Sequence, residues 1–245
     1  MAWLLIDNSN SRTKFRLGDA DGLHDWRAIL RTDELDVSTI RRLTNGVEFS
    51  AVAVASVVPA KEKLIRECFA EKYEYHQLTA ESPLGYGFDL ESPEQIGHDR
   101  LANVLALKTN HGAPGIAIDF GTAITFSVLS MEGKFAGGVI APGIECMTEY
   151  LSSKTAQLPA IKAVAITSAI GKTTVEALQA GAVIGNRGMV REILKELTTE
   201  MAAAPVIVAT GGGAKFGASG LPEITHVDHD LTLEGLRLLA ARVFC

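Results

Sequence analysis

The chain has 245 residues, a formal net charge of −6, 47% hydrophobic residues and 21% charged residues. This composition excludes a disordered protein, because enough apolar side chains are present to form a core. The acidic balance argues against a general affinity for DNA or RNA, whose phosphates need clustered Lys and Arg. It still allows a small anionic ligand, which needs only a local group of hydrogen-bond donors.

Cys68, Cys146 and Cys245 are widely spaced and form no CxxC pair, which favours reduced thiols in a cytosolic protein. The short apolar run at the N-terminus is not preceded by basic residues, so no signal peptide is expected. No apolar stretch reaches the length that spans a bilayer. We therefore expect a cytoplasmic protein with neither a membrane nor a nucleic acid as partner.

The first half of the chain predicts a mixed sheet with helices. Short apolar runs predict strands, and Phe49–Val58 is typical of a strand buried in a parallel sheet. Ser92 is predicted to cap a helix with Pro93 in its first turn. The expected elements are strands at Trp3–Asp7, Thr13–Gly18, Leu23–Leu30 and Phe49–Val58, and helices at Asp33–Asn45, from Pro59 and from Ser92.

The pattern restarts after Gly112–Gly115, which predicts a second domain. The expected elements are strands at Gly115–Asp119, Ala123–Ser130, Lys134–Ile140 and Val206–Ala209, and helices at Ile144–Lys154, Val175–Met201 and Leu231–Phe244, the last capped by Asp230. Both halves open with a strand, an aspartate and a small polar turn, which favours a duplicated α/β fold. We place the domains at 1–113 and 114–245, and expect that the final helix can pack on the first.

Two turns are candidates for phosphate binding. Asp7–Lys14 carries an acid, several hydroxyl or amide groups and a lysine, and the backbone N–H groups of such a turn can cradle phosphate oxygens. Asp119–Thr125 resembles it, with Gly121 allowing close approach of a ligand. Ordinary hairpin turns have the same composition, so each turn taken singly is a weak signal.

Other motifs leave alternatives open. Gly97-His98-Asp99-Arg100 is either a solvated acid–arginine pair or a base beside an arginine that binds an anionic substrate. Gly171-Lys172-Thr173 lacks the upstream glycine of a P-loop, since Ile166 stands there. The glycine-rich segment from Thr210 does not complete a GxGxxG motif but suits the approach of a base or ribose. For His226–Asp230 we predict a polar strand end, which we favour over a metal cluster.

Taken in order, these motifs resemble type III pantothenate kinases. The resemblance includes the turns at Asp7 and Asp119 and the Gly97–Arg100 signature, and it covers nearly the whole chain. The other matching segments are Gly137–Gly143, Gly171–Thr174, Thr210–Gly212 and Leu231–Leu236.

The resemblance implies two ribonuclease-H-like domains of the actin and sugar-kinase superfamily with an interdomain ATP cleft. It implies phosphorylation of pantothenate to 4'-phosphopantothenate, the first step of coenzyme A biosynthesis, with ATP, Mg²⁺ and a potassium or ammonium ion. Asp99 would be the general base and Asp119 the cation ligand. The substrate-binding residues would be Gly97, His98, Asp99, Arg100, Thr174 and Tyr86. The ATP-binding residues would be Asp7, Asn8, Ser9, Asn10, Ser11, Arg12, Thr13, Lys14, Thr122, Gly211 and Gly212.

One position departs from the family pattern, since Ser9 stands where the first turn usually has glycine. A serine would strain that turn if the backbone there had a positive φ, and we therefore expect Ser9→Gly to retain or improve ATP affinity.

Two further expectations concern function and assembly. A nucleotide-binding regulatory or accessory protein without kinase activity is the alternative function. Another phosphotransferase or phosphohydrolase of the superfamily is a further one. Small residues along Val175–Met201 favour a homodimer, in which Thr174 would reach the pantothenate of the other subunit.

Overall fold

The computed structural model describes residues 1–245, which fold into two compact units. The first unit comprises Met1–Gly112, Gly133–Ala136 and Asp230–Cys245, and the second comprises Ala113–Glu132 and Gly137–His229. Each unit contains most of one five-stranded sheet. None of the helices combines the length and the apolar character that crossing a membrane requires.

The first sheet has the strand order β3-β2-β1-β4-β5. Its strands are β1 (Trp3–Asn8), β2 (Arg12–Gly18), β3 (Leu23–Arg31), β4 (Ala51–Ser56) and β5 (Glu74–Gln77). β1 is antiparallel to β2 and parallel to β4. Every residue of β1 and of β4 is buried, as expected for central strands that are covered on both faces.

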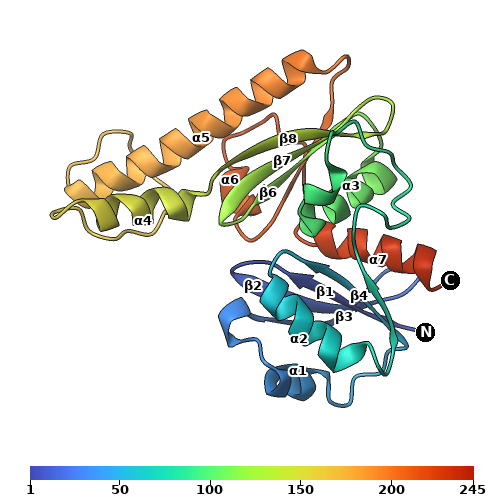
Figure 1. Ribbon diagram of the computed structural model, residues 1–245. Coiled ribbons are helices and arrows are strands. Elements are labelled where there is room, and N and C mark those ends of the chain that lie inside the picture. The colour runs from blue at the N-terminus through green and yellow to red at the C-terminus, as the bar shows by residue number, and fades with distance from the viewer. The chain divides into compact units, whose positions relative to one another are not determined.

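Helices α1 (Val37–Thr44) and α2 (Pro59–Phe69) lie on one face of this sheet and α7 (Leu231–Val243) on the other (Figure 1). Alternate residues of β1 point to opposite faces. Leu4 and Ile6 join the core that contains Ile40 and Ile65 of the helices, whereas Trp3 lies 6.3 Å from the Phe244 ring after α7.

Helix α3 (His98–His111) packs along α7 within the same unit. Gly235 of α7 faces the backbone of α3, where a Cβ atom would overlap the carbonyl oxygen of Ala102. Beside this contact the Thr232 hydroxyl donates a hydrogen bond to Asn103 Oδ1 at 2.8 Å, and both residues are buried. The pair satisfies polar groups that would otherwise be costly in the interior.

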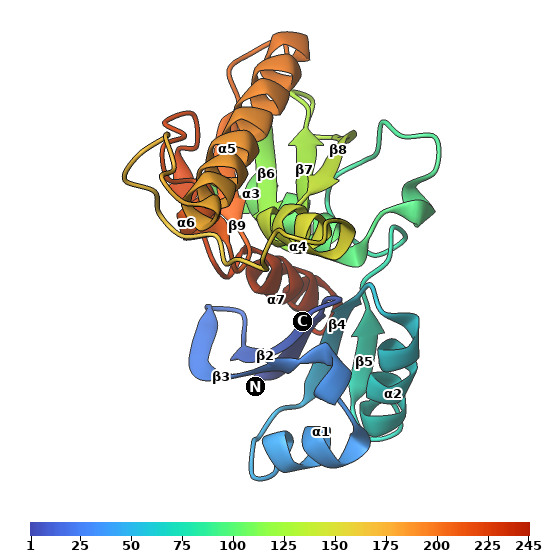
Figure 2. The ribbon, with the colours of Figure 1, turned by 90° about the vertical axis from the view of Figure 1, so that its left-hand side faces the viewer.

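The second sheet has the strand order β10-β9-β6-β7-β8. Its strands are β6 (Gly115–Phe120), β7 (Ala123–Leu129), β8 (Phe135–Pro142), β9 (Val206–Thr210) and β10 (His226–Val227). Helices α4 (Ile144–Lys154) and α5 (Thr174–Glu200) lie side by side, and α6 (Ala214–Gly217) follows β9 (Figure 2). Ile118 and Phe126 of the sheet form the core with Val190 and Leu194 of α5.

The expected strands and most helices are confirmed, and several boundaries are corrected. Helix α3 begins at His98 with Gly97 at its N-cap, because Pro93–Gln95 form a separate turn of 3-10 helix and Ser92 makes no side-chain cap. Asp230 also makes no side-chain cap; its carboxylate binds Arg16 Nη1 at 2.6 Å. The short strand β5 was not predicted, since it is brief and polar.

Helix α1 is shorter than expected as well. It begins after Asp36, whose side chain accepts from the Thr39 amide, and Thr32–Glu34 form a 3-10 turn before it.

Candidate active site

The turn at Asp7–Lys14, between β1 and β2 and called the first turn below, places a carboxylate, an ammonium and a hydroxyl group together. Asp7 at the end of β1 is paired in register with Lys14 of β2, so both side chains lie on one face of the sheet. Lys14 Nζ lies 3.0 Å from Asp7 Oδ2. Ser9 Oγ donates to Asp7 Oδ1 at 2.9 Å. The carboxylate is 2% exposed and is therefore held from two sides.

A buried polar network supports this turn from beneath. The Thr32 hydroxyl donates to the carbonyl oxygen of Ser9 at 2.7 Å, and the Thr32 amide donates to the carbonyl oxygen of Ser11 at 3.1 Å. Thr13 Oγ1 lies 3.0 Å from Thr32 Oγ1. The turn is therefore fixed by Thr32, which is distant in sequence and belongs to no motif that predicts this role.

Two residues of the turn have inward side chains. Asn8 Nδ2 donates to Thr13 Oγ1 at 2.8 Å, and Asn8 Oδ1 accepts from Ser56 Oγ at 2.7 Å. Both Asn8 and Thr13 are buried. Their side chains therefore support the turn from within, which leaves its backbone groups as the part that can face a ligand.

The remaining predicted residues of the turn are open to solvent. Asn10, Ser11 and Arg12 are exposed, and Ser9 and Lys14 are partly buried. No residue other than glycine has a positive φ. The expected strain at Ser9 is therefore wrong, because its backbone is in a region open to any residue.

Asp99 lies in the first turn of α3, where its Oδ1 atom accepts from the Arg100 amide at 2.8 Å. A Cβ atom at Gly97 would lie 2.7 Å from this same oxygen, so the absence of a side chain at Gly97 leaves room for the carboxylate. Burial raises the pKa of Asp99, and the negative charge of Asp7 raises it further. A carboxylate with a raised pKa is a stronger base at neutral pH.

His98 lies beside Asp99 and contacts the support of the first turn. Its ring hydrogen-bonds the backbone of Ser56, and burial lowers its pKa. The Nδ1 atom is buried without a protein partner. His98 is therefore neutral at pH 7 and links the start of α3 to the residue that holds Asn8.

Arg100 and Tyr86, both predicted to bind substrate, face an aromatic cluster in the first unit. Arg100 is 9% exposed and its guanidinium lies 5.5 Å from the centre of the Phe135 ring. The Tyr86 hydroxyl donates to the Leu101 carbonyl oxygen at 2.8 Å, and its ring packs against Phe88 and Phe135. Tyr86 therefore commits its hydroxyl to α3.

In the second unit the turn after β6 is surrounded closely by backbone. The Gly143 amide, at the start of α4, donates to the Thr122 carbonyl oxygen at 3.0 Å. The Gly213 amide donates to the Phe120 carbonyl oxygen at 2.9 Å. Gly211 has a φ of 91°, and a Cβ atom there would overlap Asp119 Oδ1. A glycine is required at Gly211 for both reasons.

The groups around Asp119 fit a monovalent cation. Asp119 is in register with Thr210 of β9, which places their side chains on the same face of the sheet. The Thr210 hydroxyl is buried and has no hydrogen-bond partner in the protein. A carboxylate, a hydroxyl and nearby carbonyl oxygens are hard oxygen ligands. No group of three or more His, Cys, Asp or Glu side chains forms a metal site of another kind.

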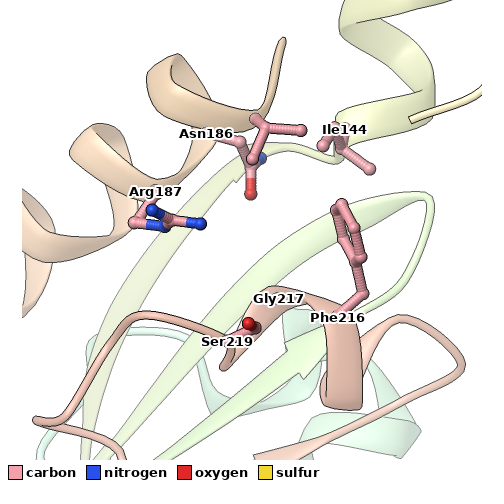
Figure 3. A pocket seen from close by; sticks show the side chains of 7 residues that line it. Ile144, Asn186, Arg187, Phe216, Gly217 and Ser219 are labelled. Atoms are coloured by element: carbon pink, nitrogen blue, oxygen red, sulfur yellow. The ribbon is translucent and has the colours of Figure 1, made fainter. Parts of the chain in front are cut away.

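A small pocket opens in the second unit between α4, α5 and α6 (Figure 3). Apolar groups of Ile144 and Phe216 face one another across it, and Asn186 and Arg187 project into it from α5. Asn186 is 5% exposed. Its lining therefore combines a ring, aliphatic groups and a few polar side chains.

Thr174 is the first residue of α5 and is exposed. The cap of this helix is Thr173, whose side chain accepts from the Glu176 amide at 3.2 Å. Glu176 in turn accepts from the Thr173 amide at 3.1 Å, which completes a capping box. The side chain of Thr174 therefore takes no part in capping the helix.

Comparison with known proteins gives consistent results for fold. A Campylobacter jejuni protein assigned to the Baf family of transcriptional activators shares the fold with a TM-score of 0.65 at 20% identity, covering 98% of both chains. An inorganic polyphosphate/ATP-glucomannokinase from an Arthrobacter species has a TM-score of 0.53 at 12% identity, covering 98% of this chain and 99% of its own. The fold is therefore that of the actin and sugar-kinase superfamily.

The sequence comparison is more specific. Residues 3–196 match the type III pantothenate kinase family. A type III pantothenate kinase from Akkermansia muciniphila is 44% identical, covering 98% of both chains. One from Methylacidiphilum infernorum is 37% identical, covering 96% of this chain and 87% of its own. With these matches over nearly its full length, the chain belongs to the type III pantothenate kinase family.

Proposed function

We propose that this chain transfers the γ-phosphoryl group of ATP to the primary hydroxyl of pantothenate. The product is 4'-phosphopantothenate, so the reaction opens coenzyme A biosynthesis. The observation that carries the proposal within this family is Asp99, a carboxyl with a raised pKa in the first turn of α3.

Asp99 acts as the general base. It accepts the hydroxyl proton of pantothenate while that oxygen attacks the γ-phosphorus, and the bond to the β-phosphate oxygen breaks. The Arg100 amide holds Asp99 Oδ1 at 2.8 Å, which orients the carboxylate and leaves Oδ2 toward the substrate. Arg100 supplies positive charge for the carboxylate of pantothenate.

The first turn receives the phosphates. Its open backbone and the side chains of Asn10 and Lys14 offer donors to phosphate oxygens. Mg²⁺ bound with ATP would neutralise phosphate charge. Asp7, the carboxylate of this turn, would hold the hydrated ion.

The second unit carries a turn of the same kind. Asp119 and the Thr210 hydroxyl would bind potassium or ammonium, and Thr122 would meet the phosphates. Gly211 and Gly212 let the ribose approach the backbone, because a Cβ atom at Gly212 would meet nothing within 4 Å.

The proposed enzyme is a homodimer whose subunits associate through α5. Ala177, Gly181, Ile184 and Gly188 recur at helical spacing and are all exposed, and no atom lies within 4 Å of a Cβ at Gly181 or Gly188. Tyr150 is 63% exposed on the adjacent α4. An exposed apolar stripe with small residues allows two helices to approach closely across a twofold axis. Thr174 at the start of α5 would then contact pantothenate in the other subunit.

A direct assay tests the proposal. The purified protein is incubated with ATP, Mg²⁺ and pantothenate, with and without potassium, and the products are analysed by mass spectrometry. We expect phosphopantothenate and ADP in equal amounts, with a higher rate in potassium. Binding of ATP without product over a range of both ions would instead favour the nucleotide-binding accessory protein.

A further inference from the structure

Ser9 has a contact that the glycine usual at this position could not make. Its hydroxyl donates to Asp7 Oδ1 at 2.9 Å, while Lys14 Nζ lies 3.0 Å from Asp7 Oδ2. Each carboxylate oxygen thus has its own donor. A carboxylate that is bonded at both oxygens cannot rotate without breaking one of these bonds.

Two hydrogen bonds hold the main chain of Ser9 in place. The Ser9 amide donates to the Arg12 carbonyl oxygen at 3.1 Å, and the Ser9 carbonyl accepts from the Thr32 hydroxyl at 2.7 Å. Thr32 is 3% exposed, so this support belongs to the folded core. The Ser9 main chain is therefore held before any ligand arrives, and the bond to Asp7 selects the rotamer of the hydroxyl; both contribute to preorganisation.

We infer that Ser9 is a positioning residue that fixes the orientation of the Asp7 carboxylate toward the hydrated Mg²⁺ of Mg·ATP. The inference rests on the proposed nucleotide site. It requires no contact between Ser9 and the nucleotide, because the hydroxyl acts through Asp7. Each of these oxygens keeps a further acceptor site for a metal-bound water after it has accepted one donor.

The expected effect is specific to the metal complex. Without the hydroxyl, the Asp7 carboxylate can rotate in the free protein. Part of the binding free energy of Mg·ATP is then spent on fixing its orientation. Loss of one hydrogen bond to a charged group should weaken Mg·ATP binding about tenfold. Binding of ATP without Mg²⁺ should change less than about twofold, because no metal-bound water then needs the carboxylate.

The test is calorimetric titration of ATP, with Mg²⁺ or with EDTA and in the absence of pantothenate, into the wild type and into Ser9→Ala, Ser9→Gly and Ser9→Thr. Ala and Gly should show the selective loss, and Thr should restore binding because it keeps a hydroxyl. Thermal melting of each variant checks that the fold is intact. If Ser9→Ala or Ser9→Gly fails to fold, Ser9→Thr is compared with the wild type instead. The two proteins should bind Mg·ATP with the same affinity.

Ser38→Ala is the matched control. Ser38 Oγ donates to Asp36 Oδ1 at 2.8 Å, the same spacing of two residues, on the exposed start of α1. Its removal should leave both titrations unchanged.

Three outcomes overturn the inference. The first is wild-type Mg·ATP affinity in Ser9→Ala, and the second is an equal loss with and without Mg²⁺, which would indicate direct contact with a phosphate. The third is a wild type that binds no Mg·ATP, which removes the proposed function too. Selective binding loss in a protein that does not phosphorylate pantothenate would overturn the proposed function alone.

Discussion

Asp7 and Asp99 are carboxylates of one unit with different surroundings. Lys14 and Ser9 bind Asp7, whereas burial and the charge of Asp7 both raise the pKa of Asp99. Ionising Asp99 in the folded protein therefore carries a cost to stability. Such a cost is common where a side chain serves catalysis.

Asp99→Asn should lower turnover by about 100- to 10,000-fold, the usual effect of removing a general base. Binding of ATP should persist, because the first turn does not depend on this carboxylate. The variant should also melt at a higher temperature than the wild type at a pH above the raised pKa, where the wild-type carboxyl is ionised. Steady-state kinetics, ATP titration and thermal melting measure the three effects, and near-normal turnover in the folded variant would exclude Asp99 as the base.

The sign of the stability effect follows from linkage. A raised pKa means that the folded state binds the Asp99 proton more tightly than the unfolded chain does. Its contribution to stability is therefore present below the ordinary pKa of 3.8 and is lost as the pH rises through the raised pKa. At a pH above the raised pKa the wild type carries the full cost, and the uncharged asparagine does not.

The pH dependence of the reaction should report the coupling between the two acids. The acid limb of kcat/KM should lie above 3.8, the ordinary pKa of the Asp99 carboxyl. Asp7→Asn removes a like charge and should move that limb to lower pH, even if the rate itself falls. The control is Asp33→Asn, which removes the carboxylate of an exposed ion pair with Arg31. It should not move the acid limb. A limb that stays in place in Asp7→Asn would contradict the coupling.

Helices α3 and α7 of the first unit pack with their backbones in close contact. Gly235 has no room for a side chain, since a Cβ atom would overlap the Ala102 carbonyl. The contact places α3, and with it Asp99, against a helix from the far end of the chain. The start of α3 is therefore positioned by tertiary packing as well as by its own cap.

Gly235→Ala should destabilise the protein by about 1–3 kcal/mol, because overpacking forces the two helices apart. The midpoint of urea unfolding should fall, with a smaller effect on ATP affinity. Gly22→Ala is the matched control, since a Cβ atom there meets nothing within 4 Å and the φ of Gly22 is not positive. Equal midpoints for the two variants would show that the helices adjust without cost.

At the scale of the whole molecule, the exposed stripe on α5 carries the proposed assembly. The N-terminal half of this helix exposes Val175, Gly181 and Ile184, whereas Val190 and Leu194 of its other half enter the core. A helix that is anchored at one end and apolar on its exposed side at the other is suited to a subunit interface.

Gly181→Trp should weaken association and lower activity together, because the side chain fills the space between the subunits. Sedimentation at assay concentration and the coupled kinase assay measure the two effects. Glu196→Trp, at an exposed position on the second half of α5, should leave both unchanged. A fully active wild-type monomer would remove both the dimer and the shared role of Thr174.

The sequence by itself determined most of the strands, the two turns at Asp7 and Asp119, and most of the helices. These features depend on short-range rules: apolar runs of strand length, turn residues after an acid, and helical spacing of apolar groups. The ordered motifs also determined the family, which the comparisons confirmed. The helix cap predicted at Ser92 failed because Pro93–Gln95 close a separate turn before α3.

Only the tertiary structure decided which side chains of the first turn face inward and what supports them. Asn8 and Thr13 are buried because Ser56 and Thr32, distant in sequence, supply their hydrogen-bond partners. The main chain of Ser9 is likewise held by the distant Thr32, which lets its hydroxyl bind Asp7. Buried polar groups must be paired, and the partner of such a group is chosen by how the chain packs, which no local pattern records.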